Sequence, residues 1–166
     1  MKKSKITGLL LALVAGTALF ASCGDDDTSS NSAPEITKVW ARTSPMETSL
    51  GAVYMTISSK DGDELTDVSV DSSIAAMAEI HEMVMAPSDT SMSMTSDAPA
   101  GEMVMQEVDS VVIDAGGSVD LMPGGYHIML MEIAAPLELG AKFDVTLTFA
   151  TAGKITVVAE VRDEAP

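Results

Sequence analysis

The sequence predicts an all-β domain, an antiparallel sandwich or barrel, and three observations support this class. Short stretches rich in Val, Ile, Thr and Met recur along the chain, and most alternate apolar with polar residues. Turn residues separate these stretches, for example Asp61-Gly62, Gly116-Gly117 and Pro123-Gly124-Gly125. No long window has a helical period, and only Ser72–Ala78 resembles the start of a short helix. About eight to ten short strands in one domain are typical of a sandwich or barrel.

The expected strands share this composition and follow one another at short intervals. In chain order they are Ile36–Trp40, Ala52–Ser58, Leu65–Val70, Ala76–Met85, Glu102–Val108, Val111–Ile113, Ser118–Met122, Tyr126–Met131, Lys142–Phe149 and Lys154–Val161. We expect them to form a single domain over residues 35–166, because a chain of this length can bury one core.

The N-terminus predicts export from the cytoplasm. Three lysines precede the apolar run Ile6–Ala21, which is shorter than the roughly 20 residues of a membrane-spanning helix. Residues 1–22 therefore resemble a secretory signal peptide. The run ends in Ala21-Ser22-Cys23, which resembles a bacterial lipobox, so we expect Cys23 to carry the lipid that anchors the protein to the membrane. The alternative is an ordinary signal peptide that leaves Cys23 as a spare thiol.

Composition restricts the partners of the exported chain. Residues 23–34 are acidic and rich in Ser, which predicts a flexible tether. Removing residues 1–22 takes away three lysines and no acids, so the formal net charge of −16 becomes −19. Such a charge repels nucleic acid and attracts cations, although it also serves solubility. Cys23 is the single cysteine, which excludes an intrachain disulfide.

Both histidines of the chain lie beside methionines on expected strands. Met77, Glu79, Met83 and Met85 lie two or four residues from His81. Met129 and Met131 lie two and four residues after His127. Side chains two residues apart in a strand point to the same face, about 6–7 Å apart at the backbone. Each strand can therefore present an imidazole and a thioether to one metal ion.

These ligand types favour Cu(I). Thioether sulfur is soft and uncharged, whereas zinc prefers thiolate, imidazole and carboxylate, and Ca²⁺ or Mg²⁺ requires oxygen. A thioether also avoids the disulfide formation that threatens a thiolate outside the cytoplasm. The alternative is structural, because methionine often fills a core and a histidine often has no ligand role.

A segment rich in Ser, Pro and Asp, residues 86–101, interrupts the strand pattern. It predicts a loop between two strands, and it contains Met92 and Met94. Methionine is an unusual residue in an exposed polar loop, so a role in metal binding and a simple surface insertion are both open.

The stretch Pro123–Leu130 (PGGYHIML) resembles the signature of the periplasmic copper chaperones called the PCu(A)C family. That family carries a His, a Met about ten residues later, and a His-x-Met about twenty-one residues after that Met. Met105 and His127 are separated by 21 residues, and His127-Ile128-Met129 completes the pattern. The segments Glu79–Glu82, Val39–Arg42, Ala52–Met55 and Pro136–Gly140 also resemble family segments.

The resemblance implies a cupredoxin-like Greek-key β-barrel and a copper site made of His81, Met105, His127 and Met129. One spacing departs from the family pattern, because 23 residues separate His81 from Met105. Residues 86–101 therefore look like an insertion, and Met103 or Met83 remains an alternative to Met105. Met83, Met92, Met94 and Met103 are candidate auxiliary ligands.

The family's activity is to bind Cu(I) and deliver it to an apo copper protein, notably the CuA centre of cytochrome oxidase. The resemblance therefore implies a membrane-anchored, extracytoplasmic copper chaperone. A membrane-anchored copper buffer without a dedicated acceptor would use the same ligands. We expect no enzymatic activity, because two histidines without a nucleophile or paired-carboxylate motif give it little support. A blue-copper electron carrier is disfavoured because it needs a Cys ligand, and a plain interaction module would not bind copper.

Overall fold

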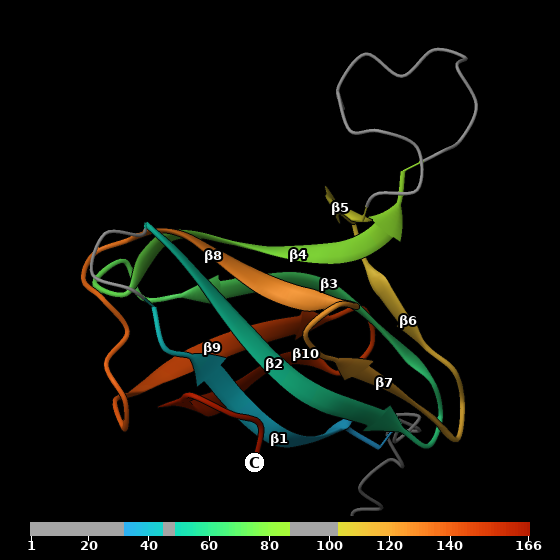
Figure 1. Ribbon diagram of the computed structural model, residues 1–166. Helices are drawn as coiled ribbons and strands as arrows, with labels where there is room; N and C mark the ends of the chain where they lie inside the picture. The colour runs from blue at the N-terminus through green and yellow to red at the C-terminus, as the bar shows by residue number, and fades with distance from the viewer. Residues whose placement is uncertain (1–31, 45–48, 87–102) are drawn as a thin grey trace, which may run out of the picture. The chain divides into compact units, whose positions relative to one another are not determined.

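The computed structural model describes residues 32–44, 49–86 and 103–166, and these form ten β-strands (Figure 1). Within these ranges the protein has no helix, and no segment that could span a membrane as a helix. In chain order the strands are β1 Glu35–Arg42, β2 Leu50–Ser59, β3 Asp63–Val70, β4 Ala75–Met85, β5 Met103–Glu107, β6 Val111–Ile113, β7 Gly117–Leu121, β8 His127–Ile133, β9 Lys142–Phe149 and β10 Gly153–Arg162. The all-β prediction is confirmed.

The strands form one hydrogen-bonded path in the order β5-β4-β8-β2-β1-β10-β9-β3-β6, and β7 pairs with β2. The path folds over on itself: β4 and β8 lie in one layer, while β1, β9 and β10 lie in the other (Figure 1). Strand β2 joins the layers, because its first residues pair with β8 in one layer and it also pairs with β1 in the other. All pairs are antiparallel except β1 with β10.

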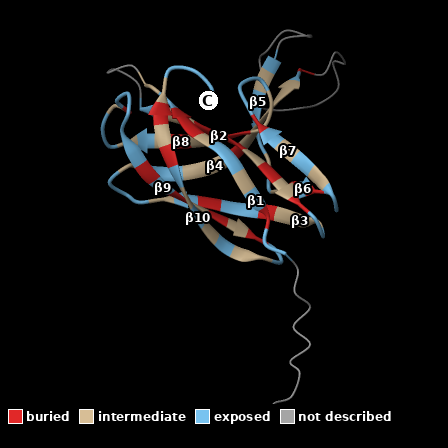
Figure 2. Ribbon diagram, turned by 90° about the horizontal axis from the view of Figure 1, so that it is seen from below, coloured by how far each residue is buried: buried red, intermediate tan, exposed pale blue. Residues whose placement is uncertain are grey.

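The core follows from the alternation of side chains along the strands. More buried and more exposed positions alternate along β6, β7, β9 and β10, so each of these strands has one face toward the interior (Figure 2). The buried face is almost entirely aliphatic and aromatic, including Val53, Ile57, Leu65, Ile128, Leu130, Val145, Leu147 and Val161. A core of this kind leaves the outer face of the β5–β4–β8 layer available for other chemistry.

The stretch Ser72–Ala78, which resembles the start of a short helix, forms a turn and the beginning of β4 instead. Asp71 begins a tight turn, in which the backbone N–H of Ser73 donates to the Asp71 carboxylate and that of Ile74 donates to the Asp71 carbonyl. From Ala75 onward the chain pairs with β8. Asp and Ser bond readily to nearby backbone in turns, and strand pairing then prevails over the helical tendency of the alanines.

The Asp63 carboxylate connects β3 to the turn between β9 and β10. It accepts hydrogen bonds from the backbone N–H groups of Glu64, Thr151 and Ala152 at 2.8, 2.9 and 3.0 Å. Burial acts to raise the pKa of Asp63, but these donors together hold it below its ordinary value of 3.8. Because the pKa is lowered in the folded state, the stabilisation is present above pH 3.8 and is lost as the pH falls.

Replacing Asp63 with alanine is therefore expected to lower the free energy of unfolding by about 1–3 kcal/mol at pH 7. The difference from the unsubstituted protein should shrink as the pH falls below 3.8. Urea unfolding at pH 7 and pH 3 measures it, with the solvent-exposed Asp67→Ala on the same strand as the control. An equal loss at both pH values would contradict the role of the carboxylate charge.

Candidate metal site

Strand β8 places His127 and Met129 on the outer face of its layer. A tight turn precedes the strand, with Gly124 at a φ of 85°, a conformation that favours glycine. The alternating residues Ile128 and Leu130 are fully buried in the core. His127 is itself 7% exposed, so its imidazole lies at the boundary between the core and the outer face. The predicted alternation within this strand is confirmed.

Strand β4 brings the second histidine to the same place. His81 is directly opposite His127 in the antiparallel register of β4 and β8, and the centroids of their rings are 5.9 Å apart. The two histidines are separated by 45 residues in the chain. Strand pairing alone therefore makes them neighbours, and their imidazoles can bind one ion together.

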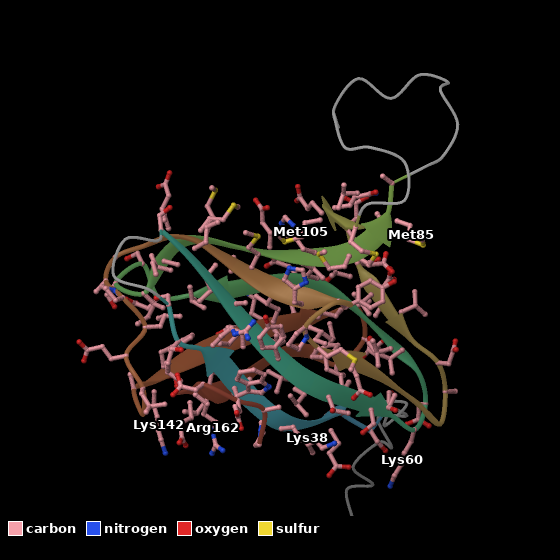
Figure 3. All side chains as sticks on the ribbon, viewed as in Figure 1. Lys38, Lys60, Met85, Met105, Lys142 and Arg162 are labelled. Atoms are coloured by element: carbon pink, nitrogen blue, oxygen red, sulfur yellow. The ribbon has the colours of Figure 1, made fainter. Side chains whose placement is uncertain are left out.

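Strand β5 supplies a thioether. In the register of β4 and β5, Met105 pairs with Met83, and His81 pairs with Glu107. The Met105 sulfur lies 3.3 Å from Nε2 of His127, and the Met105 side chain is 53% exposed. Figure 3 shows Met105 on the outer side of the β4–β8 layer. The contact joins a nitrogen from β8 to a sulfur from the edge strand.

The hydrogen bond of His127 determines which of its nitrogens is free. Nδ1 lies 3.0 Å from the carbonyl oxygen of Gly125, which can only accept a hydrogen bond. Nδ1 therefore carries the proton in the neutral imidazole. The lone pair of Nε2 then points toward the Met105 sulfur, the orientation that a metal ligand requires.

His81 is oriented by a carboxylate. Its Nε2 lies 3.1 Å from Oε2 of Glu79, two residues earlier on the same face of β4. In the neutral imidazole this contact places the proton on Nε2. Nδ1 of His81 is buried and has no hydrogen-bond partner in the protein. A buried nitrogen without a partner is costly unless it has another ligand, so Nδ1 is the available donor atom.

A pocket of about 300 Å³ opens beside the histidine on β8. Its wall includes His127, Met105 and Met129, together with Tyr54 and Arg42 from β2 and β1. Burial raises the pKa of Tyr54, against the lowering effect of the Arg42 guanidinium. The phenol therefore stays neutral, and the pocket combines two thioethers and an imidazole with a mostly apolar wall.

The structure thus brings together the four residues proposed as ligands. His81, His127 and Met105 meet across three adjacent strands, and Met129 lies two residues beyond His127 on the same face. Met83 and Met103, the other described candidates, lie on the β4–β5 hairpin. Cys23, Met92 and Met94 fall outside the described residues.

Three contributors to the site were missed by sequence reasoning. They are the Gly125 carbonyl, the Glu79 carboxylate as the partner of His81, and the Tyr54 ring, whose centroid is 6.5 Å from that of His127. The position of each in the sequence could have indicated its role. Gly125 precedes His127 by two residues, Glu79 precedes His81 by two on the same face, and Tyr54 belongs to a segment that resembled the PCu(A)C family.

Comparison with known proteins assigns a family. The family model described as "Putative lipoprotein LpqE-like" matches residues 35–161. The "Putative lipoprotein Lxx21020" of Leifsonia xyli subsp. xyli is 31% identical over 130 residues, which cover 78% of this chain and 69% of that protein.

Solved structures show the same fold. The copper-bound PCuAC domain from PmoF2 is 22% identical, with a TM-score of 0.58 over 82% of this chain and 96% of that domain. The solution structure of CuI-DR1885 from Deinococcus radiodurans is 21% identical, with a TM-score of 0.51 over 81% of this chain and 79% of that one. The predicted resemblance to the PCu(A)C family is thus confirmed in the fold, which is cupredoxin-like. The chain belongs to the family described as "Putative lipoprotein LpqE-like".

Proposed function

We propose that this domain is a copper chaperone that binds Cu(I) through His81, Met105, His127 and Met129. The observation that carries the proposal is the contact between Nε2 of His127 and the Met105 sulfur, beside a second imidazole in register across the strand pair. Two nitrogens and two sulfurs from three strands are the donor set that the sequence predicted.

The chemistry of these donors supports a soft monovalent ion. Neutral imidazole and thioether bring no negative charge, so they suit Cu(I) better than they suit Zn²⁺, Ca²⁺ or Mg²⁺. Within residues 32–44, 49–86 and 103–166, no group of three or more His, Cys, Asp or Glu side chains could hold a metal. The described part of the chain thus favours a mixed nitrogen and sulfur site.

The similar domains add support of a second kind. One of them is a copper-bound PCuAC domain, and another is described as the CuI form of DR1885. Both share the fold that places the two histidines of this chain side by side. The fold and the chemistry of the donor atoms therefore both support copper as the ion that this domain carries.

Exposure of the thioether on β5 suits transfer. Met105 is half-exposed on an edge strand, so a ligand from an acceptor can approach the ion from solvent. Neutral ligands are then displaced one at a time, and the ion passes without leaving a charged site behind. We infer that the acceptor is an apo copper protein, such as one that holds the CuA centre of cytochrome oxidase. A copper buffer without such an acceptor is the alternative.

We infer that this transfer takes place outside the cytoplasm, at a membrane. The supporting observations are the signal-like residues 1–22, the lipobox-like Ala21-Ser22-Cys23 and the lipoprotein names of the family and the relative. Mass spectrometry of the protein from membranes would show a lipid on Cys23. An unmodified thiol would contradict the anchor.

Competition and transfer assays test the proposed function together. The apo protein, titrated with Cu(I) against a chelator of known affinity, is expected to take up one tightly bound ion. Mixing the loaded protein with an apo CuA domain should then move copper to that domain faster than chelated copper moves. Tight binding without transfer would favour the buffer, and failure to bind Cu(I) would contradict both functions.

Replacing Glu79 with glutamine is expected to weaken Cu(I) binding by about 10–100-fold, although Glu79 is not a proposed ligand. The carboxylate fixes the orientation and tautomer of His81, and loss of such a partner typically has an effect of this size. The competition titration measures it, with the exposed Glu138→Gln as the control. Unchanged affinity in Glu79→Gln would show that the contact does not position the imidazole.

A further inference from the structure

The outer face of the β5–β4–β8 layer is rich in methionine beyond the four proposed ligands. Nine methionines fall in the described ranges, and all but Met55 and Met122 lie on these three strands. Sulfur atoms recur along this face, whereas the labelled cations Lys38, Lys60, Lys142 and Arg162 lie on the opposite side (Figure 3). The methionines of the layer are Met77, Met83, Met85, Met103, Met105, Met129 and Met131.

The β4–β5 hairpin carries two methionine pairs in consecutive positions. Met83 is opposite Met105, and Met85 is opposite Met103. Directly opposite residues have Cβ atoms about 4.5–5.5 Å apart. The two pairs are two residues apart, so they share one face and are separated by about 7 Å along the strands. Three thioethers beyond Met105 are therefore adjacent to one another.

Two of these three methionines are open to solvent. Met85 is 68% exposed and Met103 is 47% exposed, while Met83 is half-buried. Strand β5 is at the end of the hydrogen-bonded path, so it has a neighbour on one side within the described part of the sheet. The unbranched methionine side chain has three rotatable bonds. The sulfurs can thus turn toward a shared ion without a change in the backbone.

We propose that Met83, Met85 and Met103 form a second site for a soft monovalent cation, next to the site that contains the histidines. A site of three thioethers selects Cu(I) or Ag(I). That the ion is copper rests on the proposed function. All three donors are neutral, and no imidazole contributes, so this site binds more weakly than the first. Met105 pairs with Met83 and contacts His127, which makes it the connection between the two sites.

The opposite end of the same face offers a matched comparison. Met77 is directly opposite Met131, and Met77 is 48% exposed. The next pair toward the histidines is Glu79 with Met129, which is a proposed ligand of the first site. Two thioethers remain at that end, against three on the hairpin. The hairpin end is therefore the better site.

Silver ion in nitrate buffer is the probe, titrated into the full chain by calorimetry with methionine methyl groups followed by NMR. We expect a tight binding event followed by a weaker one, with the methyl signals of Met85 and Met103 moving in the second. The double variant Met85→Leu, Met103→Leu should lose at least about tenfold in the weaker event and keep the tight one. Leucine for methionine conserves volume, so folding is retained.

The control is the double variant Met77→Leu, Met131→Leu, which should keep both events. A single event in the unsubstituted protein would overturn the second site while leaving the first intact. A weaker event that survives in the hairpin variant, or that is lost in the control variant, would also overturn it. Absence of any event would contradict the proposed function as well as the second site.

Discussion

Replacing His127 with alanine is expected to abolish tight Cu(I) binding. The substitution removes the nitrogen that faces the Met105 sulfur at 3.3 Å, and it frees the Gly125 carbonyl that orients the ring. The affinity for Cu(I) should fall by more than the roughly 10–100-fold that is typical when a residue supporting a metal ligand is removed. Titration against a Cu(I) chelator measures the change.

Because His127 is buried, its replacement can also affect stability, and the two effects need to be separated. Urea unfolding of the metal-free variant reports the stability, and Met122→Leu is the control for copper binding. Met122 is 52% exposed and lies just after β7, outside the β5–β4–β8 layer. A folded His127→Ala protein with unchanged Cu(I) affinity would contradict the assignment of this residue as a ligand.

Substitution of the adjacent β8 residues Met129 and Leu130 is expected to affect different properties, copper affinity for Met129 and stability for Leu130. Leu130→Ala should lower the free energy of unfolding by about 2–5 kcal/mol, because Leu130 is fully buried in the core. Met129→Leu conserves volume on the outer face, so it should cost less than about 1.5 kcal/mol. The same Met129 substitution removes a thioether, and the affinity for Cu(I) should fall.

Urea unfolding of both metal-free variants, combined with Cu(I) competition titrations, provides the comparison. Met129→Leu is its own control for folding, because its stability should stay close to that of the unsubstituted protein. The division of β8 into a core face and a metal face would be contradicted if Met129→Leu unfolded the domain and left copper affinity unchanged in the folded fraction.

Most of the fold was predictable because the strands alternate and turn residues separate them. All ten expected strands are present, and β6 and β9 have the expected bounds. The end of β1 was placed too early, since Ala41 and Arg42 pair with the C-terminal strand β10. The helical start suggested by Ser72–Ala78 was wrong, because this stretch forms a turn and the beginning of β4. Both errors arise from pairing between segments distant in the chain, which local patterns do not report.

For the candidate site, the sequence predicted the residues better than their contacts. Period-two alternation correctly placed His127 with Met129, and His81 with Met83, on shared faces. The register that sets His81 opposite His127 depends on tertiary pairing, and no local pattern reveals it. The contact of Met105 with His127 favours Met105 over Met83 and Met103, in agreement with the spacing between Met105 and His127.

X-ray absorption of the protein loaded with one equivalent of Cu(I) reports which atoms bind the ion. We expect a first coordination shell with both nitrogen and sulfur scatterers, two of each. In Met105→Leu the sulfur contribution should fall, while the nitrogen contribution should stay the same. A shell of nitrogen and oxygen alone, or a spectrum unaltered by that substitution, would contradict the claim that imidazoles and thioethers from three strands hold one ion.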